Sequence, residues 1–380
     1  MYHCIIVGAG PAGGTAAYHL AKRGRSVLIL EKETLPRYKP CSGGVSPAIG
    51  QWFEFDFEPA ISLKVDQIRY SWQMSDAVEV SLRAEPMWMV QRDKFDHFLI
   101  EQAQQQGAEL QDNAEVTGIK FSHDRWQVST SKEPVVELAA FVIAADGAKG
   151  PMAKWLGLFG GKRRMSAVLE VKAQNPPDSP EMHFEFGGKK IKNGFIWNFP
   201  HTGGNSISVA TFVGGEPKDL QSVLTEYAQT VGIDISNSQR YEHPLLLWDG
   251  DRQLHAQNAV VAGEAARIAD PLMGEGIRPS IFSGMKAAEA IDLALAGDGN
   301  ALEKYTQVMS AEWGADLKMA GRIAGAFYRF PGVGYKIIKQ PVATQVMSKI
   351  LCGQLSYAEV ASTAIERLSG SLIPGKKSRS

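Results

Sequence analysis

The chain begins Met1-Tyr-His-Cys-Ile-Ile-Val-Gly-Ala-Gly-Pro-Ala-Gly-Gly14, an apolar run that leads directly into closely spaced glycines. A strand, the pattern Gly8-x-Gly10-x-x-Gly13 and then a helix over about residues 15–23 are typical of a dinucleotide-binding unit. Gly8 permits the tight turn, Gly10 lets the backbone approach a pyrophosphate, and Gly13 lets helix and strand pack closely. The free amides and positive end of the helix would then hold the phosphates. The stretch therefore predicts a dinucleotide-binding fold.

A second apolar run, residues 26–30, ends in Glu31. In such folds an acidic residue at the end of the second strand contacts ribose hydroxyls. A glycine turn alone could be purely structural, but here strand, helix, second strand and terminal acid all occur in the expected register. We therefore expect Glu31 to contact a ribose.

Two later segments indicate which dinucleotide is bound. An apolar strand at 141–145 ends in Asp146-Gly147, and another at 259–262 ends in Gly263-Glu264. Gly274-Glu275-Gly276 then precedes a helix expected over 277–295, where backbone amides can face the edge of a flavin ring. Asp146 either caps the next turn or positions the cofactor, and both interpretations stay open. Three such segments in this order predict FAD as the cofactor, not NAD.

Three further motifs carry a resemblance to a known family. They are Pro36-x-x-Lys-Pro-Cys-x-Gly-Gly44, Phe195-x-Trp-x-Phe-Pro200 and Val90-x-Arg-x-x-Phe-Asp96. With them the chain, over about residues 1–300, resembles the geranylgeranyl reductase group of FAD-dependent oxidoreductases, which have the p-hydroxybenzoate hydroxylase-like fold. In two places it departs from that group's pattern: Gly263-Glu264 replaces Gly-Asp, and Ser208-Val209-Ala210 replaces a Gly-x-Gly. Larger groups along the substrate channel could mean a narrower or different substrate.

The resemblance and the strand patterns together imply a mixed α/β (α+β) fold. We expect a Rossmann-type FAD-binding domain interleaved with an antiparallel-sheet substrate domain, followed by a helical C-terminus. The predicted bounds are 1–60, 88–160 and 250–300 for the FAD-binding domain, 61–87 and 161–249 for the substrate domain, 301–370 for the helical region and 371–380 for a basic tail. Alternating runs near 165–171, 182–186, 195–199 and 206–213 predict the antiparallel strands.

Composition sets limits on the partners and the location. The net charge of −1 is not the excess of positive charge that nucleic-acid-binding proteins usually have. Three widely spaced cysteines suit a reducing compartment, and neither they nor the histidines show metal-ligand spacing. There is no apolar run of about 18 residues and no leader before the first strand. We therefore expect no metal and a cytoplasmic protein that could touch a membrane peripherally.

Site residues follow from the motifs and the resemblance. Cys41 lies on the loop that the resemblance places near the flavin, where Lys39 and Arg37 would favour its thiolate. It either gates the ring or donates a proton, or it is only a small packing residue. Phe195, Trp197 and Phe199 lie on one face of a strand. They either line the binding site of a hydrophobic substrate or form part of the hydrophobic core. The predicted catalytic residues are Cys41, Trp197 and Phe195. The predicted cofactor contacts are Gly8, Gly10, Ala12, Gly13, Gly14, Glu31, Cys41, Ser42, Gly44, Arg92, Val116, Asp146, Glu264, Gly274, Gly276 and Ile277.

The resemblance implies that reduced FAD delivers hydride to a carbon–carbon double bond of a hydrophobic substrate, such as a prenyl (geranylgeranyl-type) chain. NAD(P)H, ferredoxin or a quinol would supply the electrons. The main alternative is a flavin-dependent monooxygenase or halogenase of the same fold, because the aromatic motif is also similar to the W-x-W-x-I-P of halogenases. A non-catalytic flavin-binding protein and a simple NAD-dependent dehydrogenase are further alternatives.

Overall fold

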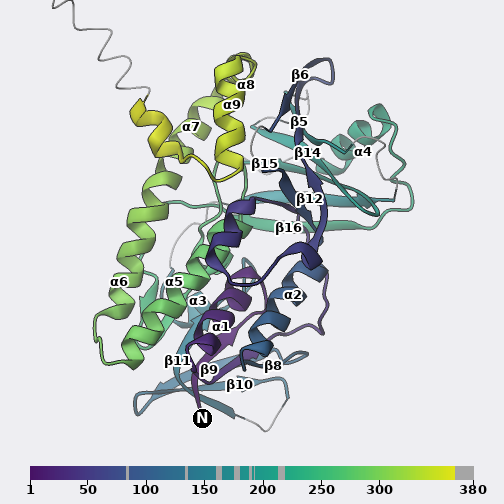
Figure 1. Cartoon of the computed structure of the whole chain (residues 1–380). Helices are drawn as coiled ribbons and strands as arrows, with labels where there is room; N and C mark the ends of the chain where they lie inside the picture. The colour runs from purple at the N-terminus through teal and green to yellow at the C-terminus, as the bar shows by residue number, and fades with distance from the viewer. Residues whose placement is uncertain are drawn as a thin grey trace, which may run out of the picture.

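The computed structural model describes residues 1–82, 85–132, 136–159, 165–174, 180–187, 191, 193–212 and 219–363. The predicted basic tail, 371–380, lies outside these residues, as does the predicted helical region beyond 363. Over the described residues the chain forms an α/β part that carries the N-terminus, and a second part in which helices cover a large antiparallel sheet (Figure 1). The predicted mixed fold is therefore confirmed.

An eight-stranded sheet forms the centre of the α/β part. Its main strand order is β17-β18-β11-β1-β2-β8, with β10 paired to β11 and β9 to β10. The bounds are β1 Tyr2–Val7, β2 Val27–Leu30, β8 Glu109–Gln111, β9 Val116–Ser122, β10 Arg125–Thr130, β11 Val136–Ala144, β17 His255–Ala256 and β18 Ala259–Val261. The strands β18, β11, β1, β2 and β8 run parallel. The apolar runs of β1, β2, β11 and β18 are buried, as is typical of parallel strands covered on both faces, whereas β8 at the edge is polar.

Helices pack closely around this sheet. They are α1 Pro11–Lys22, α2 Arg92–Gln105, α3 Met152–Trp155, α5 Ile277–Leu295 and α6 Ala301–Val308, with short 3₁₀ turns η1 Pro47–Trp52, η2 Glu58–Ala60 and η3 Gly263–Ala266 and the π-helical turn η4 Met309–Gly314. The close contact of α5 with α1 depends on Gly284, since a side chain there would meet the backbone of Ala12. The helix predicted over 277–295 is confirmed at both ends.

The second part is built on a seven-stranded sheet in the order β16-β12-β15-β14-β13-β5-β6. The bounds are β5 Gln67–Trp72, β6 Asp76–Ser81, β12 Met165–Ala173, β13 Met182–Phe186, β14 Gly194–His201, β15 Gly204–Thr211 and β16 Arg240–Leu246. The four strands predicted from alternation correspond to β12–β15. All neighbours are antiparallel except β13 and β5, which run parallel.

The two faces of the seven-stranded sheet bury different residues. Ile196 packs on the side covered by α4, Leu220–Thr230. Phe195 and Trp197, on the opposite face of the same strand, share a core with residues of α7, Ala315–Arg329, α8, Pro331–Ile338, and α9, Pro341–Leu351. A three-stranded sheet of β3 Gly44–Val45, β7 Met87–Val90 and β4 Ile61–Val65 completes the described fold.

Candidate active site

Two adjoining cavities contain most of the predicted site residues. The first is lined by Gly10, Ala12, Cys41, Ser42, Gly44, Arg92, Trp197, Glu264, Gly274, Gly276 and Ile277. The second is lined by Gly8, Gly10, Glu31, Val116 and Asp146. Both cavities share Lys39, Pro40, Ala145, Gly147 and His243. Such a pair of connected cavities suits a long, two-ended ligand. Of the predicted site residues, Gly13, Gly14 and Phe195 line neither cavity.

The three motif glycines have different surroundings. Gly8 adopts φ +106°, which favours glycine, and a side chain at Gly13 would run into the carbonyl oxygen of Gly8. At Gly10 an added Cβ would meet only the guanidinium nitrogens of Arg37, at 3.8 Å, and of Arg92, at 4.0 Å. Gly8 and Gly13 therefore serve the turn and its packing, whereas Gly10 keeps the cavity wall open.

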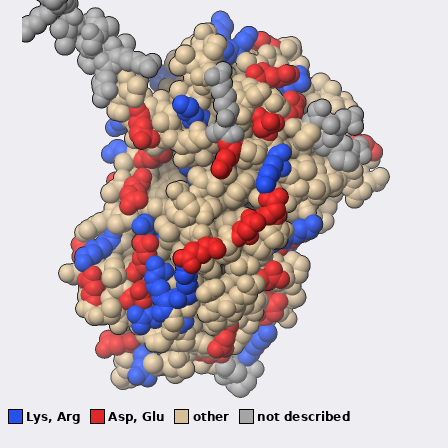
Figure 2. Space-filling model, viewed as in Figure 1, with Lys and Arg blue, Asp and Glu red and all other residues tan. Residues whose placement is uncertain are grey.

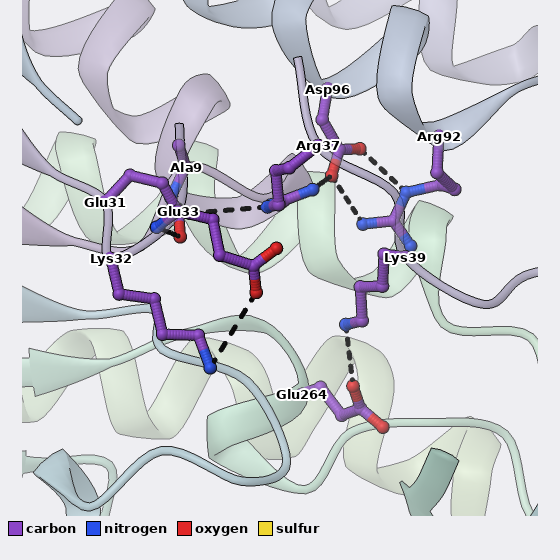
Figure 3. A network of polar contacts seen from close by, with 9 residues as sticks. All are labelled: Ala9, Glu31, Lys32, Glu33, Arg37, Lys39, Arg92, Asp96 and Glu264. Atoms are coloured by element: carbon purple, nitrogen blue, oxygen red, sulfur yellow. Dashed lines mark hydrogen bonds and ion pairs between the residues drawn. The ribbon is translucent and has the colours of Figure 1, made fainter. Parts of the chain in front are cut away.

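Glu31 is buried and is held by the backbone around it. Its Oε2 accepts a hydrogen bond from the Ala9 amide at 2.9 Å, and its Oε1 accepts one from the Glu33 amide at 3.1 Å. The Arg37 guanidinium lies 3.5 Å from Oε2 (Figure 3). Glu31 thus fixes the glycine turn, a role that the sequence pattern did not indicate. Its predicted contact with a ribose stays a prediction.

Arg92 and Arg37 converge on one buried carboxylate. Arg92 binds Asp96 through two nitrogens, each at 2.7 Å, and Arg37 donates to the same carboxylate at 2.7 Å (Figure 3). Burial acts to raise the pKa of Asp96, but the two arginines outweigh it and hold that pKa below its ordinary value. Arg92 lines the first cavity and uses two of its five N–H donors on Asp96.

Glu264 forms a second charged cluster at the other side of the cavities. It accepts from Lys39 at 3.0 Å, lies 3.1 Å from the Nε2 of His243, and accepts from the Leu246 amide at 3.3 Å. Burial acts to raise the pKa of Glu264, yet Lys39 and His243 lower it well below its usual range. The longer acid that replaces the family's Asp therefore reaches Lys39 of the Lys-Pro-Cys segment.

Cys41 lines the first cavity as a neutral thiol. Burial raises the pKa of that thiol, and the opposing effect of Arg92 does not cancel the increase. The expectation that Lys39 and Arg37 favour a thiolate is wrong, because these cations are paired with Glu264 and with Asp96 and Glu31. A thiol that keeps its proton at neutral pH is a poor nucleophile, because the thiolate is the reactive form.

The aromatic wall differs in one position from the prediction. Trp197 and Phe199 line the first cavity, with Phe184 beside them. Phe195 is fully buried in the core, with its ring 5.2 Å from that of Phe212 and 5.0 Å from that of Trp197. Phe195 therefore supports the wall from behind instead of facing the cavity.

Glu170 is a buried acid that the motifs did not single out. It lies on β12 with no exposed surface, and its Oε1 accepts from the Tyr38 hydroxyl at 2.8 Å. Burial raises the pKa of Glu170 to about 7, against the lowering effect of Tyr38 and Lys172. The only sequence signal was an acid within the apolar run Val168-Leu169-Glu170-Val171.

Several features of the cavities fit a flavin dinucleotide. The N-cap residues of α1 and α5 are Gly10 and Gly276, which have no capping side chain, so the N-terminal amides of both helices are open to an acceptor in this part of the described chain. A Cβ at Gly276 would meet nothing described within 4 Å. The buried Oδ1 of Asp146, in the second cavity, has no hydrogen-bond partner among the described residues. The helix amides can therefore donate to the oxygens of one elongated ligand, and the Asp146 carboxylate can accept from one of its hydroxyls.

A protein-family comparison agrees with these cavities. The family described as FAD binding domain matches residues 1–194, about half of the chain. The chain therefore belongs to the FAD binding domain family, and FAD is its cofactor.

Sequence relatives give the class more closely. The chain is 29% identical to digeranylgeranylglycerophospholipid reductase 1 of Methanothermobacter thermautotrophicus, over 82% of this chain and 83% of that protein. It is 28% identical to geranylgeranyl diphosphate reductase of Rhodobacter capsulatus, over 76% of this chain and 74% of that one. The predicted geranylgeranyl reductase-like class of FAD-dependent oxidoreductases is thus confirmed.

Solved structures show the same fold. A geranylgeranyl bacteriochlorophyll reductase-like protein from Thermoplasma acidophilum aligns with a TM-score of 0.82 at 21% identity, covering 96% of this chain and 98% of that one. A flavin-dependent brominase aligns with a TM-score of 0.71 at 19% identity, covering 97% of this chain and 99% of that one. At these identities the likeness concerns the fold alone.

Proposed function

We propose that this flavoenzyme saturates carbon–carbon double bonds of a hydrophobic, prenyl-type substrate. The main supporting observation is that the neutral Cys41 thiol, the Trp197 and Phe199 side chains and the Gly274–Ile277 segment line one cavity. The names of the reductases reported above, which act on geranylgeranyl compounds, support the same substrate class. Reduced FAD would supply the hydride when it is bound.

In this proposal the predicted cofactor residues hold the FAD. The α1 N-terminus at Gly10 and Ala12 takes the phosphates, and the α5 N-terminus at Gly276 and Ile277 takes the oxygen-bearing edge of the ring. Asp146, through its free oxygen, accepts from a hydroxyl in the second cavity. Gly13, Gly14 and Glu31 act indirectly, by shaping the turn that carries the amides.

Cys41 supplies the second half of the reduction. Hydride addition to one carbon of an alkene requires a proton at the other carbon. Since burial keeps the Cys41 thiol protonated, it can donate that proton within a cavity that has an apolar wall. Trp197 and Phe199 hold the chain of the substrate and exclude water beside the thiol.

The test is an anaerobic assay with dithionite as reductant and a geranylgeranyl substrate, with products analysed by mass spectrometry. We expect the product to gain two hydrogen atoms, one as hydride and one as a proton, for each double bond reduced. Cys41→Ala should retain FAD but lose most turnover, whereas Cys352→Ala, a buried cysteine outside both cavities, should behave as wild type. Full turnover in Cys41→Ala would remove Cys41 from proton transfer.

The flavin-dependent monooxygenase or halogenase remains the second candidate, since a brominase shares the fold. Stoichiometric oxygen consumption with an added aromatic substrate, and no product from the prenyl substrate, would favour it. NAD(P)H, ferredoxin or a quinol as the natural donor, and a cytoplasmic location with peripheral membrane contact, stay predictions of the same proposal. Acidic and basic side chains are interspersed on the face seen in Figure 2, in line with a partner other than nucleic acid.

A further inference from the structure

Large apolar side chains are exposed together on the helices near the C-terminus. Phe330, Val333 and Ile337 are 60%, 59% and 59% exposed, and Val342, at the start of α9, is 65% exposed. Positions 330, 333 and 337 follow the spacing of one helical face. We call these four residues the α8 apolar face. In Figure 1, α8 and α9 lie at the opposite end of the molecule from the N-terminus.

The opposite side of α8 is firmly packed, so the apolar face is not a displaced core. Tyr335 and Ile338 are buried against the seven-stranded sheet. The Tyr335 hydroxyl donates to the carbonyl oxygen of Asp76 at 2.5 Å, and Lys339 pairs with the Asp76 carboxylate at 2.6 Å. The helix is thus anchored on one side and presents apolar residues on the other, which is typical of an interaction surface.

The helices that carry this face have an excess of positive charge. Between Asp316 and Glu359 the sequence has six lysines and arginines and no acidic residue, although the whole chain has a net charge of −1. Lys339 is neutralised by Asp76, but Lys318, Arg322, Arg329, Lys336 and Lys349 are exposed. The Arg329 guanidinium lies 5.7 Å from the centre of the Phe330 ring. Exposed apolar residues among cations match the interface of an anionic bilayer.

A second copy of the chain fits this face less well. In a two-fold symmetric dimer the same surface meets itself, which would bring exposed Arg329 and Lys336 of one copy close to the same cations of the other. An anionic lipid surface instead offers acyl chains for Phe330, Val333, Ile337 and Val342, and phosphates for the surrounding cations.

The same helices lead to the first cavity. Leu351, the last residue of α9, lines that cavity, and Val346 packs on the core that contains Trp197 and Phe184. We propose that the α8 apolar face and its cations dock onto an anionic lipid bilayer, which places the first cavity close to a membrane-borne substrate. The docking stands on the exposed residues alone, whereas the delivery of a prenyl lipid rests on the proposed function.

Vesicle sedimentation of the full-length, FAD-loaded protein tests the docking. We expect the protein to sediment with vesicles of phosphatidylcholine and phosphatidylglycerol, and much less with phosphatidylcholine alone or at high salt. The double variant Val333→Asp/Ile337→Asp should bind the anionic vesicles about tenfold more weakly or worse. Leu293→Asp is the matched control, because Leu293 is 49% exposed on α5, away from this face.

A charge variant tests the role of the cations, with FAD content and unfolding temperature measured as controls for folding. Arg329→Gln/Lys336→Gln should weaken binding to anionic vesicles while leaving FAD content and the unfolding temperature unchanged. Equal sedimentation of wild type and both double variants would overturn the proposal. So would a concentration-dependent dimer that the Val333→Asp/Ile337→Asp variant abolishes. If the protein binds vesicles but does not reduce a prenyl lipid in them, the docking stands and the proposed function fails.

Discussion

Two glycines of the first motif separate cofactor binding from folding. Gly10 has φ −83° and ψ −175°, a conformation open to any residue, and its Cβ position has no described atom closer than 3.8 Å. Gly13 has no such room, because its Cβ would overlap the Gly8 carbonyl oxygen. Gly10→Val should therefore fold but exclude FAD, whereas Gly13→Ala should destabilise the protein itself.

The structure allows both effects to be estimated. A valine at Gly10 would project between the α1 N-terminus and any phosphate bound there. Losing two charge-assisted hydrogen bonds from the amides costs about 3–6 kcal/mol, or about 10²–10⁴ in the FAD dissociation constant. The overlap at Gly13 must be relieved by a backbone shift, which costs about 1–3 kcal/mol of folding free energy.

The assay measures both quantities for both variants. FAD affinity comes from flavin fluorescence during titration of the apoprotein, and stability from thermal or urea unfolding of the same apoprotein. Retention of FAD by Gly10→Val at wild-type affinity would refute the placement of the phosphates at this helix. An apoprotein of Gly10→Val as unstable as that of Gly13→Ala would refute the distinction between the two glycines.

Three further predictions test the cavities and the buried acid. Trp197→Ala should weaken substrate binding by about 1–3 kcal/mol, seen as a higher KM, because it removes aromatic area and widens the cavity; an unchanged KM would exclude Trp197 from the binding wall. Gly276→Val should weaken FAD binding more than Glu264→Ala, since valine enters the cavity whereas the carboxylate already serves Lys39; the reverse order of dissociation constants would contradict this. The pKa of Glu170 is raised from 4.5 to about 7 in the folded state, so its contribution to stability is present below about pH 4.5 and lost as the pH rises through about 7. Glu170→Gln should thus gain up to about 3 kcal/mol over wild type at about pH 8 and little at about pH 4, measured by urea unfolding; a pH-independent difference would contradict the raised pKa.

Local patterns were sufficient for the elements that bind the cofactor. Parallel strands buried on both faces have continuous apolar sequences, so β1, β2, β11 and β18 could be predicted from residues 1–31, 141–145 and 259–262. The helix over 277–295 follows Gly276, has its proline, Pro279, in the first turn, and continues from Met285 to Leu295 without Gly or Pro, so it too was predictable. Residues 61–87 were assigned to the substrate domain, but β5 and β6 were not predicted as strands. β5 joins the sheet by pairing with β13, more than a hundred positions away in the sequence, and β6 pairs with β5.

The environment of each side chain was harder to predict than its place on an element. Alternation showed that Phe195, Trp197 and Phe199 share a face, but not where along that face the cavity ends. Cations next to Cys41 in sequence were assumed to act on the thiol, although the carboxylates that neutralise them come from the residue after β2, from α2 and from η3 after β18. Pairing with residues distant in sequence decides the pKa, and no local pattern contains that information.

The Lys-Pro-Cys segment shows how such distant contacts produce a site. Arg37 is tied to Asp96 on α2, Tyr38 to Glu170 on β12, and Lys39 to Glu264 after β18. Three consecutive side chains thus fasten the segment to three separate elements, two of the α/β part and one of the seven-stranded sheet. Because each anchor fixes a different direction, the loop that follows has little freedom, and it places Cys41 in the first cavity without any regular structure of its own. The residues around the cysteine therefore position a neutral thiol, because the charges of Arg37 and Lys39 are neutralised by the carboxylates that anchor them.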